Sequence, residues 1–178
     1  MRAPKIHWSL RDSIQRVIES IAPILQITLA AMIGYSIAHY GLGHAIPLLA
    51  VTVSITSLGF TRDARPRRVV ETAAGMIFGI ALSETLLTFF GQGLWQMATI
   101  LLISFTLARF VNPSAAFALT VGIQSMLVYL LPAPVGGVYM RSIDGIIGGL
   151  VALAVTALIP RNPRAMAIKD GDKLFDMF

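Results

Sequence analysis

Six long apolar stretches, separated by short polar breaks, dominate this sequence and decide its class. They cover 18–40, 45–60, 69–90, 94–111, 115–131 and 143–159. A helix needs about 20 apolar residues to cross a bilayer and about 17 at the least, so the second, fifth and sixth stretches are close to the limit. Because a chain of 178 residues cannot enclose that much apolar surface in water, we predict an all-α polytopic membrane protein of about six transmembrane helices.

The distribution of cations predicts the orientation. With a cytoplasmic N-terminus, 13 of the 14 Lys and Arg residues fall on the cytoplasmic side and only Arg141 falls outside. This is the positive-inside pattern of a bacterial inner-membrane protein with both termini in the cytoplasm. It makes the lipid bilayer, not nucleic acid, the partner of a chain with net charge +5. The predicted parts are an interfacial lead-in (1–16), a six-helix transmembrane domain (17–160) and a cytoplasmic tail (161–178).

The third and sixth stretches begin alike. In register, the matched pairs are Arg68 with Arg141, Glu71 with Asp144, Gly75 with Gly148 and Gly79 with Ala152. Each half of the chain then holds three spans, and an odd number of spans places the two halves in opposite orientations. The sequence therefore predicts a 3+3 inverted repeat, a plan shared by many secondary transporters.

Small residues and ion pairs follow from the same spacing. Small residues four apart share one helix face and let two helices approach closely, which predicts helix packing at Gly75, Gly79, Gly148, Gly149 and Ala152. Each arginine lies three residues before an acid, so Arg68 can pair with Glu71 and Arg141 with Asp144. These pairs are open to a structural or a transport role.

Other polar residues inside the apolar stretches are candidates for transport. Glu84 lies among leucines with no cation nearby in sequence, so it either exchanges protons or has a structural role, in which it extends to the outer surface or hydrogen-bonds a neighbouring helix. His39 and His44 are predicted to be interface residues, not metal ligands. A possible substrate path is formed by Pro47, Ser54, Thr56, Pro113, Thr120 and Gln124.

The sequence carries no recognisable enzyme site. It has no cysteine, only three histidines, no P-loop and no HExxH motif. We therefore predict no catalytic residues, no cofactor and no metal site.

Two motifs resemble those of a known family. The run PLLAVTVSITSLG at 47–59, followed by RRVVE at 67–71 and by Gly75, resembles the first motif of the fusaric acid resistance, or aromatic acid exporter, superfamily (the FUSC-like membrane domain). The run RSIDGIIGG at 141–149 resembles the second, and the whole is most similar to short actinobacterial members. The resemblance implies a six-helix module that exports aromatic or other organic acids with the proton gradient. It carries the family's charged positions onto Arg68, Glu71, Arg141 and Asp144, and its glycines onto Gly75 and Gly148.

Two functions remain open at this point. The first is a proton-coupled membrane transporter of an organic anion, with Glu84 or Asp144 as the proton-exchanging group, working as a homo-oligomer. The second is a non-transporting scaffold or accessory subunit of a cell-envelope enzyme or lipid-handling complex. Many relatives carry a helical cytoplasmic domain after the sixth helix, whereas about eighteen residues follow Pro160 here, which favours the second function.

Overall fold

The computed structural model describes residues 10–59, 66–132 and 137–159, in which all regular secondary structure is helical, without strands. The elements are α1 (Leu10–Ser36), the π-helical turn η1 (Ile37–Gly41), α2 (Leu48–Leu58), α3 (Pro66–Phe90), α4 (Leu94–Val111), α5 (Ala115–Leu130) and α6 (Met140–Leu158). The prediction of an all-α polytopic membrane protein is confirmed. Residues 1–9 of the predicted lead-in and the whole predicted tail lie outside the described residues.

The helices are not equally long. Four segments of the described chain are long and apolar enough to cross a membrane: 20–41, 67–90, 94–111 and 140–158. The other two helices are shorter, and α2 with 11 residues extends only about 16 Å, half of a hydrocarbon core about 30 Å thick. Our expectation of a second full span at 45–60 was therefore wrong in length. Most of the α2 side chains are buried by neighbouring helices, so its ends do not have to face lipid.

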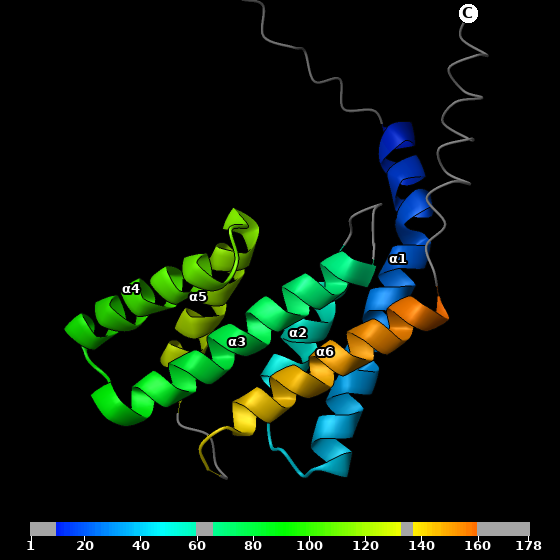
Figure 1. Ribbon diagram of the computed structural model, residues 1–178. Helices are drawn as coiled ribbons and strands as arrows, with labels where there is room; N and C mark the ends of the chain where they lie inside the picture. Colours follow the sequence, from blue (N-terminus) through cyan, green and yellow to red (C-terminus); the bar gives the residue numbers. More distant parts are fainter. Residues whose placement is uncertain (1–9, 60–65, 133–136, 160–178) are drawn as a thin grey trace, which may run out of the picture.

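Two long helices, α3 and α6, pack against each other in the middle of the bundle (Figure 1). The shorter helix α2 packs against α6, and α5 packs against α3. The outer positions are taken by α1 and α4, which lie on opposite sides of the bundle in Figure 1. Large apolar side chains of both outer helices are exposed, including Leu29 and Met32 of α1 and Leu102 and Phe110 of α4. These surfaces suit contact with lipid.

The helix pairing has a two-fold character. Exchanging α1, α2 and α3 for α4, α5 and α6 turns the α2–α6 contact into the α5–α3 contact, and the α1–α2 contact into the α4–α5 contact. One contact departs from this scheme, because α2 also packs against α3 and α5 makes no equally extensive contact with α6. This pairing is what an inverted repeat would produce, and the 3+3 repeat itself stays a prediction.

Two glycines occupy matching places in this pairing. A Cβ atom on Gly148 would lie 2.4 Å from the carbonyl oxygen of Ala50 in α2, and one on Gly79 would lie 2.5 Å from that of Val121 in α5. The sequence comparison of the two halves paired Gly75 with Gly148, whereas the helix contacts pair Gly79 with Gly148. The predicted alignment is therefore shifted by one helical turn.

Hydroxyl groups complete both contacts in the same way. Four residues after Ala50, the Ser54 hydroxyl donates to the Gly148 carbonyl (3.1 Å). Four residues after Val121, the Ser125 hydroxyl donates to the Gly79 carbonyl (3.0 Å). The three other predicted packing residues, Gly75, Gly149 and Ala152, are also buried.

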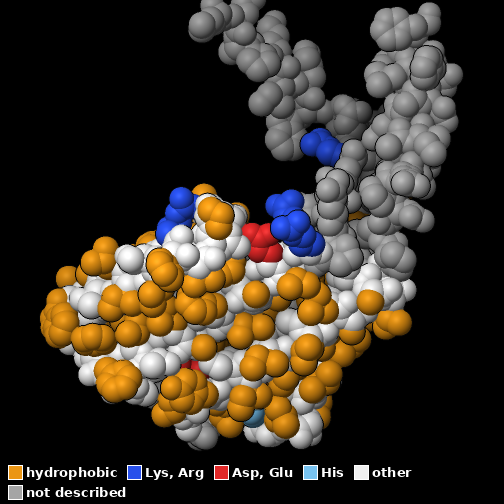
Figure 2. Space-filling view, viewed as in Figure 1, with side chains coloured by type: hydrophobic (Ala, Val, Ile, Leu, Met, Phe, Trp, Pro, Cys, Tyr) orange, Lys and Arg blue, Asp and Glu red, His pale blue; other side chains and the backbone are white. Residues whose placement is uncertain are grey.

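The exposed arginines of the helix bundle gather at one of its ends, whereas Arg141 is buried at the other. Arg67 and Arg68 begin α3 and Arg109 lies in the last turn of α4, and Figure 2 shows Lys and Arg side chains along the upper edge, above a mainly apolar body. We call this the basic end. The other end, where α6 begins with Met140 and Arg141, is called the opposite end. This separation fits the predicted orientation, and the side of the membrane that each end faces stays a prediction.

Candidate functional site

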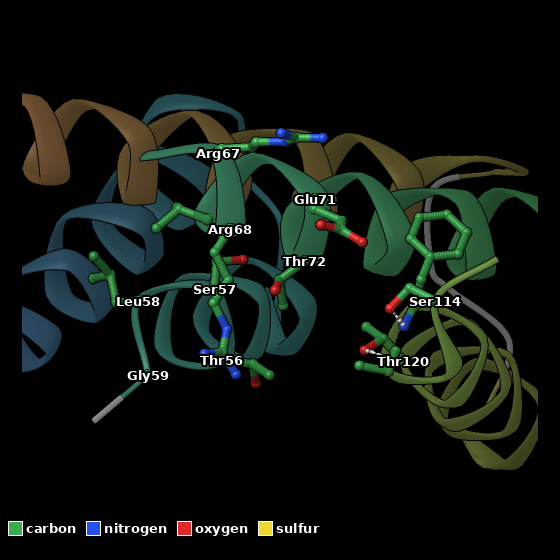
Figure 3. A pocket seen from close by; sticks show the side chains of 13 residues that line it. Thr56, Ser57, Leu58, Gly59, Arg67, Arg68, Glu71, Thr72, Ser114 and Thr120 are labelled. Atoms are coloured by element: carbon green, nitrogen blue, oxygen red, sulfur yellow. Dashed lines mark hydrogen bonds between the residues drawn. The ribbon is translucent and has the colours of Figure 1, made fainter. Parts of the chain in front are cut away.

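A pocket of about 540 Å³ opens at the basic end, between the end of α2, the start of α3 and the start of α5 (Figure 3). We call it the basic pocket. It is lined by Thr56, Ser57, Leu58, Gly59, Arg67, Arg68, Val69, Glu71, Thr72, Ser114, Ala116, Phe117 and Thr120. A cavity of about 300–1,000 Å³ is the usual size of a small-molecule site.

Local turn chemistry shapes the wall that α5 contributes. The Asn112 side-chain oxygen accepts a hydrogen bond from the backbone N–H of Ser114 (2.8 Å). The Ser114 hydroxyl in turn accepts one from the backbone N–H of Phe117 (3.4 Å). An Asn turn followed by a serine N-cap is a strong helix start, so α5 begins at the pocket and directs the positive end of its dipole toward it.

The two arginines of the basic pocket have no ion-pair partner among the described residues. Arg67 and Arg68 are exposed, and neither forms a hydrogen bond or a salt bridge within the described part of the chain. Glu71 instead points toward the start of α5 (Figure 3) and accepts a hydrogen bond from the Asn112 amide (3.2 Å). The predicted Arg68–Glu71 pair is therefore not formed. A salt bridge between water-exposed side chains would contribute little to the stability of the fold. Because Glu71 binds Asn112 instead, both guanidinium groups are able to bind an anion.

The opposite end holds buried charges in a different arrangement. The predicted Arg141–Asp144 pair is also not formed, because Asp144 hydrogen-bonds His44 through Nδ1 at 2.5 Å, with both side chains 6% exposed. The expectation that His44 is an interface residue was therefore wrong. The two residues are 100 positions apart, so no spacing rule could have found the pair. The only sequence signal was that an acid inside an apolar stretch needs a partner.

Arg141 binds the last turn of α5. Its guanidinium donates to the carbonyl oxygen of Val128 (3.0 Å) and to that of Pro132. The last carbonyls of a helix lack partners within the helix, and a cation at this position also interacts favourably with the helix dipole. The arginine of the second motif therefore joins α6 to α5 and does not balance its neighbouring acid.

Glu84 stabilises the first turn of α6. Its carboxylate accepts hydrogen bonds from the backbone N–H groups of Arg141 (3.2 Å) and Ser142 (3.1 Å) and from the Ser142 hydroxyl (2.5 Å). Of the roles that the sequence left open, a hydrogen bond to a neighbouring helix is the one that these contacts describe. The carboxylate acts as the N-terminal cap that α6 lacks in its own sequence.

A second pocket relates the two ends to each other. It measures about 190 Å³ and lies between the start of α2, the end of α5 and the start of α6, with His44, Arg141 and Asp144 in its lining. Under the exchange of α1–α3 for α4–α6, this is the counterpart of the basic pocket, which lies between the start of α5, the end of α2 and the start of α3. The counterpart of the basic pocket is therefore the smaller of the two, and a separate pocket of about 370 Å³ at the opposite end borders Glu84 and Gly137.

The predicted substrate path is divided by the structure. Thr56 and Thr120 line the basic pocket, whereas Ser54 and Gln124 are buried in helix contacts. The two prolines, Pro47 and Pro113, precede α2 and α5 without lining either pocket. In the described residues, no group of three or more His, Cys, Asp or Glu side chains could hold a metal ion.

Comparison with known proteins gives one family and one relative. The model of a family described as fusaric acid resistance protein-like matches residues 27–155. A Corynebacterium glutamicum protein, described as uncharacterized, is 29% identical over 163 residues, which is 91% of this chain and 42% of that protein. The chain therefore spans about two fifths of this relative's length. No solved structure matches the chain significantly.

Proposed function

Because the chain belongs to the fusaric acid resistance protein-like family, a membrane transport-related family, we propose that it exports aromatic or other organic acids through the bilayer. The observation that carries this proposal is the basic pocket. It combines two guanidinium groups, neither paired with an acid of the described residues, with several hydroxyl groups and the apolar ring of Phe117. An aromatic acid fits this pocket, because its carboxylate can bind an arginine and its ring can pack on the apolar wall.

The unequal ends of the bundle support a transport cycle. An exporter has to bind its substrate at one membrane face and release it at the other, and a carrier built from two related halves does so by opening one end at a time. Of the two matching pockets, the one at the basic end is the larger, at about 540 Å³ against about 190 Å³, as a state that loads substrate from the cytoplasm requires. This assignment uses the predicted orientation, with the basic end in the cytoplasm of a bacterium.

The first test is transport by the purified full chain in proteoliposomes, with radiolabelled 4-hydroxybenzoate as a probe aromatic acid. We expect Arg67→Gln and Arg68→Gln each to raise KM about tenfold, because a hydrogen bond to a charged group contributes about 1.5–3 kcal/mol and about 1.4 kcal/mol corresponds to tenfold in affinity. The double variant should bind more weakly than either single one. Arg109→Gln is the matched control, since Arg109 lies at the same end but does not line the pocket.

The rival function remains a scaffold or accessory subunit in a membrane complex. If the reconstituted chain carries no anion but co-purifies in fixed stoichiometry with an envelope enzyme, the scaffold replaces the exporter. If the chain carries the probe and the two arginine variants behave like Arg109→Gln, the exporter stands and the basic pocket is not its substrate site. A homo-oligomer is proposed for either function.

A further inference from the structure

Four charged or titratable side chains meet at the opposite end of the bundle, and all are nearly inaccessible. As whole residues, their exposed fractions are 6% for His44, 5% for Glu84, 8% for Arg141 and 4% for Asp144. They come from three different places: the connection before α2, the C-terminal part of α3 and the first two turns of α6. We call these four residues the His44 cluster.

The charges of the His44 cluster do not balance without a bound proton. Two carboxylates and one guanidinium give a net charge of −1 if the imidazole of His44 is neutral. An unbalanced charge is costly in a region of low dielectric constant, and a single proton makes the cluster neutral. Arg141 is already fully charged and Glu84 already accepts three hydrogen bonds. The proton therefore belongs to the His44–Asp144 pair, whose facing atoms are 2.5 Å apart.

No other described side chain can supply the missing charge. From η1, His39 approaches the cluster, but its Nδ1 is bonded to the His44 carbonyl (2.8 Å). From α5, the nearby ionisable side chain is Tyr129, whose hydroxyl donates to Gly93. The connection from α5 to α6, at 131–139, has one ionisable residue in its sequence, Tyr139, whose hydroxyl oxygen lies 3.3 Å from that of Thr85.

The pair also borders a pocket. His44 and Asp144 both line the pocket of about 190 Å³ at this end. The second ring nitrogen of His44, Nε2, has no hydrogen-bond partner among the described residues. A proton can thus reach the imidazole from the pocket, while Nδ1 keeps its bond to Asp144.

From these observations we infer that His44 and Asp144 together bind one exchangeable proton, and that this proton holds together the helices around the pocket of about 190 Å³. With the proton bound, the cluster is neutral and α6 stays joined to α3, to α5 and to the connection before α2. When the proton leaves, a negative charge is left buried, and entry of water at this end offsets its cost. The link from this proton to anion export rests on the proposed function, whereas proton binding does not.

The test uses the absence of cysteine from the chain. A single cysteine at Leu49, which is 1% exposed and lines the small pocket, reports on opening through its labelling by a hydrophilic maleimide in nanodiscs. A cysteine at Leu94, which is 87% exposed in the first turn of α4, corrects for the effect of pH on thiol reactivity. We expect the ratio of the two rates to rise about fivefold or more between pH 6 and pH 8.5, since one or two kcal/mol already changes a population by about 5–30-fold.

Variants of the pair decide the inference. The pH response should vanish in Asp144→Asn, where the negative charge is absent at every pH, and its midpoint should shift in His44→Gln, where the carboxyl of Asp144 has to bind the proton alone. The response should persist unshifted in His39→Gln, which alters the neighbouring histidine only. Survival of the response in Asp144→Asn, an unshifted midpoint in His44→Gln, or absence of the response from the unmodified cluster would overturn the inference.

A second measurement covers the case in which the cysteine at Leu49 disturbs the core. The backbone amides of Arg141 and Ser142 both donate hydrogen bonds to Glu84. As the pH rises, their hydrogen exchange should accelerate more than the intrinsic exchange rate does. This additional acceleration should require an intact His44–Asp144 pair. Neither measurement needs a substrate. A chain that carries no anion but shows these responses would refute the proposed export and leave the proton site in place.

Discussion

Replacing Gly148 with alanine is expected to destabilise the protein by about 2 kcal/mol or more, in the upper part of the usual range of about 1–3 kcal/mol for overpacking. The new Cβ would lie 2.4 Å from the carbonyl oxygen of Ala50 and 3.1 Å from its carbon. These are backbone atoms and cannot turn away as a flexible side chain can. Moving α6 outward would also lengthen the bond from the Ser54 hydroxyl to the Gly148 carbonyl. Thermal or denaturant unfolding of the detergent-solubilised chain measures the loss.

Three further glycines calibrate this result. Gly79→Ala should cost about as much as Gly148→Ala, because its Cβ would lie 2.5 Å from the Val121 carbonyl oxygen. Gly149→Ala should cost less, since its nearest neighbour is the end of the Ile77 side chain at 3.1 Å. Gly41→Ala should have little effect, because nothing lies within 4 Å. Equal losses at all four positions would mean that the contacts of α2 with α6 and of α5 with α3 are not as described.

The positions of most helices could be predicted from the sequence because local signals mark them. Gly91 and Gly93 separate the third and fourth stretches, and α3 and α4 end and begin at these residues, as expected. The start of α5 follows Asn112 and Pro113, which disfavour a continuous helix. The length of α2 could not be predicted in this way. Apolar residues continue beyond both of its ends, and the burial that allows a short helix comes from its neighbours.

The candidate site was only partly predictable. Arg68, Glu71, Thr56 and Thr120 were selected from the sequence, and all four line the basic pocket. The partners of the buried charges were missed, because the rule for residues three apart describes an isolated helix. In the bundle, Arg141 finds unpaired carbonyls at the end of α5, and Asp144 finds a histidine from the connection before α2. Both partners are set by tertiary packing, which leaves no mark on local spacing.

Replacing Glu84 with alanine is expected to be the most damaging single substitution at the opposite end, with a loss of about 3–5 kcal/mol, as when one partner of a buried charged pair is removed. It leaves the backbone N–H groups of Arg141 and Ser142 without an acceptor, and each buried unsatisfied donor costs about 1–3 kcal/mol. The helix cannot compensate locally, because its N-cap residue, Tyr139, has a left-handed backbone (φ 71°) and makes no side-chain cap. Unfolding of the solubilised chain measures this loss as well.

Two comparisons separate the cap from a general effect of removing an acid. Glu84→Gln keeps one side-chain oxygen as acceptor, so it should recover part of the stability that Glu84→Ala loses. Glu71→Ala at the basic end removes a half-buried carboxylate with a single side-chain partner, Asn112, and should cost about 1 kcal/mol. Since the first turn of α6 carries both Arg141 and Asp144, loosening it should also raise hydrogen exchange there before the rest of the bundle. A Glu84→Ala loss no larger than that of Glu71→Ala would show that α6 does not depend on this carboxylate, and would return Glu84 to the role of a free proton carrier.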